Sequence, residues 1–280
     1  MRHLGLSIFL VSLPLSTLAT VDVIWVPSFN YNDRLNKATG KIVTTPTILV
    51  LHYTVSDLEG TFDIFQTNGT VSAHYTVAEN GTIYQHVDEK YRAWHAGSGR
   101  WGNVTDVNTF SVGVEIVNYG YKVEPSQPEG IKVNGSSLEW YPFKAKQIEA
   151  VIELSADIVQ RYGMKPENVI AHSDLAPGRK DDPGPLFPWA ELSSNGVGAW
   201  VDKTTLKKPC SKSTEVVQVQ KKLQRYGYTY VQSSGVIDAD TENALVSFQM
   251  HFRQSNIGGA LDNETVSILD ALLVKYGLVR

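Results

Sequence analysis

The sequence is poor in cysteine, in excess charge and in long apolar runs, and each shortage excludes a class of protein. Its 280 residues contain one cysteine, Cys210, so no disulfide can form within the chain. The formal net charge of -4 provides no overall positive field, and we therefore expect no nucleic-acid partner. With 42% hydrophobic and 19% charged residues, the composition is that of an ordinary folded protein.

The first 20 residues, MRHLGLSIFLVSLPLSTLAT, have the pattern of a secretory signal peptide. Arg2 precedes an apolar run from Leu4 to Leu15, and small residues follow, so we expect residues 1–19 to be removed after Ala19. The alternative is an uncleaved anchor, but the run is short for the ~20 residues of a membrane span. Because no lipobox cysteine lies near residue 20, we expect no stable membrane anchor and a periplasmic or secreted location.

Residues 20–200 alternate between strand and helix patterns, which indicates an α/β or α+β domain. A Gly/Pro/Ser-rich excursion loop is expected over residues 121–141. The predicted elements are buried strands at 45–55 and 110–120, a hairpin at 72–87 that turns at Asn80-Gly81, a helix at 144–162 and a short strand at 167–172.

Residues 201–212 have the composition of a linker, and the chain beyond them has three helical patterns. We expect helices at 214–226, 239–252 and 263–276. Residues 213–280 are therefore predicted to form a small all-α domain of three helices.

The loop HSDLAPGRKDDPGP, from His172 to Pro185, combines ionisable groups with prolines and glycines that neither helices nor strands tolerate. It is either simply solvated or stiffened so that its side chains point at one place. His172 follows an apolar strand pattern, and His52 in VLHYT lies in or at the end of another. Two such imidazoles, a carboxylate and a water form an open catalytic zinc site, whereas a structural role is the alternative for each histidine. Asp182 is the favoured carboxylate, with Asp174 as its competitor.

Glu115 lies inside the apolar pattern SVGVEIVN, where burial of a charged carboxylate is costly. A strand face open to solvent would explain this residue simply. A strand facing a metal cleft would instead make Glu115 a general base for a water molecule. Lys180, in the loop described above, could then stabilise an oxyanion, although most loop lysines are only solvated.

Several segments resemble those of the zinc-dependent N-acetylmuramoyl-L-alanine amidases, whose fold is shared with the peptidoglycan-recognition proteins. These segments are HYT after an apolar run, SAHYTVAENGTIYQHV, RAWHAG, NTFSVGVEIVN, KPENVIAHSDLAPGRKDDPGPLFPW and GVGAW. The resemblance extends from about Trp25 to Trp200 in the family's order. It implies an α/β fold with a mixed β-sheet and flanking helices, and hydrolysis of the amide bond between N-acetylmuramic acid and L-alanine.

The same resemblance implies roles for individual residues. His52, His172 and Asp182 match the ligands of one zinc ion per chain, Glu115 matches the catalytic acid, and Lys180 matches the cation that polarises the scissile carbonyl. The C-terminal segments VQKKLQRYGY and DADTENALVSFQMHF resemble the three-helix peptidoglycan-binding domain. We therefore expect a monomer whose partner is peptidoglycan or a muropeptide.

Four further residues are candidates for substrate contact: His74, Trp94, His95 and Trp101. The two tryptophans could pack on sugar or stem-peptide atoms, and a structural role is the alternative for the two histidines. Two other functions remain open. One is a non-catalytic peptidoglycan-binding protein, although members of that kind lose a zinc ligand. The other is a zinc peptidase that acts on stem peptides.

Overall fold

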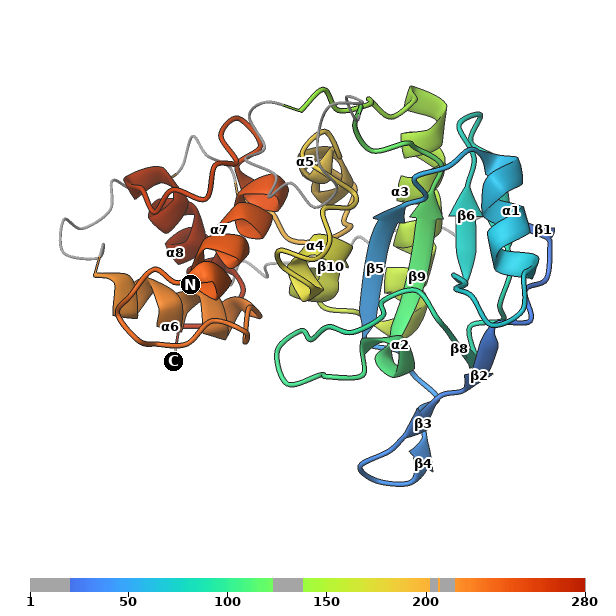
Figure 1. The fold of residues 1–280 in the computed structure, drawn as a ribbon, viewed down its shortest axis with the longest axis horizontal. Coiled ribbons are helices and arrows are strands. Elements are labelled where there is room, and N and C mark those ends of the chain that lie inside the picture. Colours follow the sequence, from blue (N-terminus) through green and yellow to red (C-terminus); the bar gives the residue numbers. More distant parts are fainter. Residues whose placement is uncertain (1–20, 123–137, 202–205, 207–214, 280) are drawn as a thin grey trace, which may run out of the picture.

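The structure is a computed structural model that describes residues 21–122, 138–201, 206 and 215–279. The predicted signal peptide, most of the predicted linker and most of the 121–141 loop lie outside the described residues. Figure 1 shows two parts lying against one another, a sheet part formed by residues 21–122 and 138–201 and a helical part formed by residues 215–279.

A six-stranded sheet forms the centre of the sheet part, in the order β1-β7-β6-β9-β5-β10. The strands β6, β9, β5 and β10 are parallel, whereas β7 is antiparallel to β6, so the sheet is mixed and the predicted fold class is confirmed. The strand bounds are β1 Ile24–Trp25, β5 Ile48–Tyr53, β6 Tyr75–Val77, β7 Ile83–Gln85, β9 Ser111–Ile116 and β10 Val169–Ala171. Four short strands form two further pairs, β2 Tyr31–Asp33 with β8 Tyr91–Ala93 and β3 Leu35–Asn36 with β4 Lys41–Ile42.

The helices of the sheet part are mostly short. They are α1 Leu58–Gln66, α2 Val107–Phe110, α3 Ala145–Tyr162, α4 His172–Leu175 and α5 Trp189–Ser194, with a 3-10 turn at Pro166–Asn168. The predicted helix α3 is confirmed and ends at Gly163, which adopts the left-handed φ of 60°. Helix α1 was not predicted, because its sequence contains a glycine and has only a short apolar pattern. Asp57 caps it by accepting a hydrogen bond from the backbone N–H of Gly60.

Both faces of the sheet are covered, which explains why its central strands are apolar without interruption. Leu49 and Leu51 on β5 face a core shared with α3, while Ile48 and Val50 face a core shared with the helical part. Successive residues of the strand therefore point alternately into the two cores.

The helical part consists of α6 Val216–Tyr226, α7 Ala239–Phe252 and α8 Asn263–Lys275, as predicted. Two glutamines occupy equivalent positions in it. Each accepts a hydrogen bond from a glycine N–H in the following loop and donates one to the threonine hydroxyl in the first turn of the next helix. The two sets are Gln220, Gly235 and Thr241, and Gln249, Gly259 and Thr265. This internal repeat was not predicted, although the pattern Gly-X-X-Asp-X-X-Thr occurs at both 235–241 and 259–265.

Trp101 joins the two parts of the molecule. Its ring centroid lies 5.8 Å from that of Tyr226 and 5.2 Å from that of Tyr228, and its indole N–H donates to the backbone oxygen of Glu167. Gly227 leaves room for this ring, because a Cβ atom there would lie 2.4 Å from it. The helical part is therefore packed against the sheet part through a continuous apolar core.

We predict that Trp101→Ala lowers the free energy of unfolding by about 3–5 kcal/mol, because it removes a large buried ring from this core. Trp25→Ala is the matched control: the Trp25 side chain is 53% exposed, against 4% for Trp101, and its loss should have a small effect. Chemical denaturation of both variants makes the comparison, and equal effects would contradict the packing role of Trp101.

Candidate metal centre

Three parallel strands bring four side chains to one edge of the sheet. His52 is near the carboxyl end of β5, and Glu115, near the end of β9, is its direct partner across the two strands. Because directly paired residues point to the same face, both side chains lie on one side of the sheet. His172 follows the last residue of β10, and the loop after it returns Asp182 to the same place.

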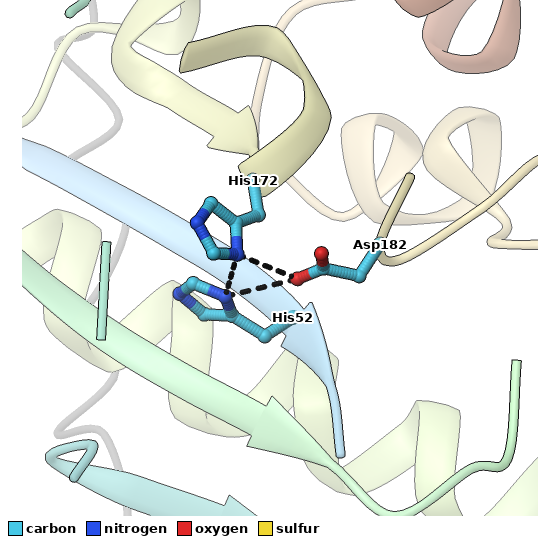
Figure 2. A group of neighbouring side chains, drawn as sticks. All are labelled: His52, His172 and Asp182. Carbon is cyan, nitrogen blue, oxygen red and sulfur yellow. Dashed lines mark hydrogen bonds and ion pairs between the residues drawn. The ribbon is translucent and has the colours of Figure 1, made fainter. Parts of the chain in front are cut away.

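The three expected ligands converge with their polar atoms facing one another (Figure 2). The Nδ1 atoms of His52 and His172 are 2.9 Å apart, and each is 3.0 Å from Oδ2 of Asp182. All three side chains are buried. Among the described residues, this is the group of histidine and carboxylate side chains whose geometry suits a metal ion.

The second nitrogen of His172 shows which atom is available to a metal. Nε2 of His172 lies 2.9 Å from the backbone oxygen of Ala96, which can only accept, so Nε2 carries the proton and Nδ1 presents its lone pair to the site.

Burial governs the charges at the site. Burial lowers the pKa of His52 to about 4, and a positive charge on His172 would act in the same direction. Burial by itself would raise the pKa of the Asp182 carboxyl, but the two imidazoles hold that pKa well below its usual range. A neutral imidazole beside a carboxylate is the donor set that divalent zinc prefers, so these residues fit a metal ion.

The loop from His172 to Pro185 directs the carboxylates of Asp174 and Asp182 to different partners. The backbone N–H of Ser173 donates to the backbone oxygen of Asp182, which ties the end of the loop to its start. Asp174 Oδ2, in contrast, accepts from the backbone N–H of Ala171, 2.8 Å away. The carboxylate of Asp182 therefore reaches the two histidines, whereas that of Asp174 belongs to the helix α4 turn.

Glu115 and Lys180 lie beside the three ligands in a pocket of about 170 Å³. Oε1 of Glu115 is 3.9 Å from Nδ1 of His52, while Oε2 is buried without a hydrogen-bond partner among the described residues. Burial raises the pKa of this carboxyl well above its usual value, and Asp182 adds to the effect while Lys180 opposes it. The pocket therefore contains a carboxyl group with raised proton affinity, as a group that accepts a proton from water needs.

Two of the four residues suggested for substrate contact are part of the core, which corrects that expectation. His74 is fully buried: its Nδ1 accepts from the backbone N–H of Gly113, and its Nε2 lies 2.8 Å from the guanidinium of Arg34. Trp101 packs against the helical part, as described above. Neither side chain lines the pocket, because each is packed against or hydrogen-bonded to other groups of the protein.

Of the other two, Trp94 is partly exposed and His95 is buried. The indole N–H of Trp94 donates to Asn32, and Trp94 is not among the residues that line the pocket. His95 does line it, but its ring also bonds to His52, with 3.0 Å between Nδ1 of His95 and Nε2 of His52.

One wall of the pocket was missed from the sequence. Tyr53, the last residue of β5, and residues 54–56 directly after it contribute to this wall. The other residues of the wall are Thr61, Ile64, Phe65, Val71 and Ser72. Val55 has a φ of 57°, a left-handed conformation that is unfavourable for a β-branched residue. No sequence pattern indicates such a conformation at a valine.

The fold and the site together define a hydrolase with a buried His-His-Asp site that could hold a metal ion, and comparison with known proteins identifies the family. The family model "N-acetylmuramoyl-L-alanine amidase" matches residues 43–185, and the model "Putative peptidoglycan binding domain" matches residues 212–269. N-acetylmuramoyl-L-alanine amidase AmiD of Escherichia coli K12 is 38% identical over 242 residues, which cover 82% of this chain and 83% of AmiD.

Solved structures agree with this assignment. AmiD from E. coli, in complex with anhydro-N-acetylmuramic acid-L-Ala-D-gamma-Glu-L-Lys, matches with a TM-score of 0.69 and 37% identity over 83% of this chain and 90% of that one. AMPDH3 from Pseudomonas aeruginosa, in complex with anhydromuramic pentapeptide, matches with a TM-score of 0.70 and 32% identity over 95% and 99% of the two chains. The chain belongs to the N-acetylmuramoyl-L-alanine amidase family and is an enzyme of that class.

We predict that Asp182→Ala abolishes tight binding of zinc, because it removes the one anionic ligand of the three. Asp181→Asn is the control. It changes the neighbouring carboxyl, whose pKa burial raises to about 6, without removing a ligand. Metal content after dialysis, measured by atomic emission, should fall only for Asp182→Ala, and full zinc retention by that variant would refute the ligand assignment.

Proposed function

We propose that this chain uses one zinc ion to hydrolyse the amide bond between N-acetylmuramic acid and L-alanine in peptidoglycan or muropeptides. His52, His172 and Asp182 are the ligands. The observation that carries the proposal is the convergence of their three donor atoms within 3.0 Å of one another. Three protein ligands leave the fourth tetrahedral position open, as a catalytic zinc site requires.

The pocket residues supply the proton transfers and the charge. Zinc bound here provides a Lewis acid for the amide carbonyl and lowers the pKa of water at the site. Glu115 takes a proton from the attacking water and then gives one to the leaving amine, a step for which its unpaired Oε2 is suited. Lys180 places a positive charge in the same pocket, where it stabilises the negative charge that develops on the carbonyl oxygen.

The ligands of the relatives support the substrate class. AmiD and AMPDH3 were solved with molecules that consist of an anhydromuramic acid and a short peptide. A zinc site could also hydrolyse peptide bonds, so the choice of the muramoyl amide rests on this relationship.

We propose that residues 20–200 form the catalytic domain, that 201–212 form a linker and that the domain of residues 213–280 supports the catalytic domain. Asp174 carries this last argument, because both of its oxygens are held by the helical part. The hydroxyl of Tyr228 donates to Oδ1 over 2.5 Å, and Nδ1 of His251 donates to Oδ2 over 2.7 Å. Asp174 is in the same short helix as His172, so the helical domain holds the turn that presents a metal ligand.

We further propose that the chain is exported and that residues 1–19 are removed. No helix within the described residues has the length and apolarity to cross a membrane. Cell fractionation with N-terminal sequencing tests this proposal, since the mature chain should begin at Thr20 in the soluble periplasmic or secreted fraction. A full-length chain in the membrane fraction would overturn it.

We predict that purified sacculi and soluble muropeptides lose their stem peptides at the muramoyl amide, and that a chelator stops the reaction. Mass spectrometry of the products distinguishes this cut from cleavage within the stem peptide. Products cut only between amino acids would make the chain a peptidase, and binding to sacculi without products would make it a binding protein.

We predict that Glu115→Gln retains the fold and the zinc but loses kcat by roughly 10²-fold or more, the range of general acid–base groups. Lys180→Ala should lower kcat more than it raises KM if the lysine acts on the transition state. Steady-state kinetics with a soluble muropeptide measure both. Near-normal turnover of Glu115→Gln, or a pure KM effect for Lys180→Ala, would contradict the assigned roles.

We predict that truncation after Trp200 lowers the melting temperature and reduces hydrolysis of soluble muropeptides and sacculi alike, because it exposes the core around Trp101 and frees Asp174. A domain that only tethers the enzyme to the wall would behave differently. A stable truncated chain that keeps its activity on muropeptides and loses it on sacculi would refute the supporting role.

A further inference from the structure

His95 lies on the sheet face that carries the metal ligand His52. Ser111, Gly113 and Glu115 alternate along this face of β9, beside the strand that carries His52. The His95 ring covers Gly113, where a Cβ atom would come within 2.4 Å of the ring carbon Cγ. The absence of a side chain at position 113 is therefore what allows the imidazole to lie there.

A chain of hydrogen bonds through His95 has only one consistent direction. Ser111 Oγ donates to the backbone oxygen of Val107 over 2.7 Å, so its lone pairs are left to accept from Nε2–H of His95 over 3.1 Å. With Nε2 protonated, Nδ1 of neutral His95 carries a lone pair. It then accepts from Nε2–H of His52 over 3.0 Å, which leaves Nδ1 of His52 as a lone-pair donor facing the other two ligands.

The backbone holds His95 in this position. The N–H groups of His95 and Ala96 both donate to Oδ1 of Asn108, over 3.1 and 2.8 Å. The backbone oxygen of Ala96 in turn accepts from His172 Nε2. One short segment thus contacts the second nitrogen of both histidine ligands, through a side chain for His52 and through a backbone oxygen for His172.

We propose that His95 is a positioning residue that sets the tautomer and the orientation of His52, so that Nδ1 of His52 faces the metal. This inference rests on the proposed zinc site. Ser111 completes the chain by fixing the tautomer of His95, and Gly113 provides the space. Groups that orient a ligand in this way typically contribute 10–100-fold to metal affinity.

The test compares His95→Leu with His95→Asn in the full chain. The two replacements have similar size, but only asparagine offers an oxygen near the position of Nδ1 that can accept from His52. Zinc affinity is measured by competition with a chromogenic chelator. We expect His95→Leu to bind zinc about 10–100-fold more weakly than the parent, and His95→Asn to recover most of the loss. Parental affinity in His95→Leu, or equal losses in both variants, would overturn the proposal.

Ser111→Ala provides a second test in case the His95→Leu variant does not fold. It removes one small hydroxyl and leaves Nε2–H of His95 without its acceptor, so we expect zinc binding about tenfold weaker. Cobalt substitution adds a spectroscopic measurement. A changed orientation of His52 should alter the visible absorption bands of bound cobalt in His95→Leu and in Ser111→Ala. Unchanged affinity and spectrum in Ser111→Ala would count against the chain of hydrogen bonds. If the parent itself bound no zinc, the proposed function would fail rather than this inference alone.

Discussion

The structure depends on holding three electron-rich atoms against one another inside the protein. Two imidazole nitrogens and a carboxylate oxygen meet at 2.9–3.0 Å, and the side chains that carry them are buried. Burial makes charge costly there, so the arrangement needs neutral imidazoles, a directed hydrogen bond to each second nitrogen and a carboxylate held by a rigid backbone. Each neighbouring feature of the fold meets one of these needs.

The stiff loop after β10 meets the need for a rigid carboxylate. Its two ends are tied together by the bond from Ser173 to the backbone of Asp182. Another of its aspartates, Asp174, faces the helical part, where His251 lies stacked on Trp189 with ring centroids 3.7 Å apart. The loop thus connects the metal centre with the interface between the two parts. Asp174, which is held at that interface, is in the same short helix as the proposed ligand His172.

The same edge of the sheet combines the candidate metal site with a carboxyl group, that of Glu115, whose Oε2 has no hydrogen-bond partner among the described residues. Glu115 is paired with His52 across two parallel strands, so the group proposed to move protons is held by the same backbone as a ligand. Leaving Oε2 without a partner costs stability, and such costs are concentrated at functional sites. Val55, in the wall of the same pocket, adopts a left-handed backbone conformation that is unfavourable for valine, and this is a second energetic cost at the site.

By itself the sequence determined the fold class, the long helices, the central strands and the two histidines that meet at the site. Apolar periodicity and turn residues are local signals, and they place both His52 and His172 at or near the ends of apolar strand patterns. From the residues themselves, Asp182 and Asp174 both remained possible ligands, and family resemblance was needed to choose between them. Only the tertiary structure decided that Trp101 and His74 belong to the core, that the three-helix part packs on the enzyme through Asp174, and that His95 bonds to a ligand. These outcomes depend on strand register and on contacts between distant segments, which local sequence patterns do not encode.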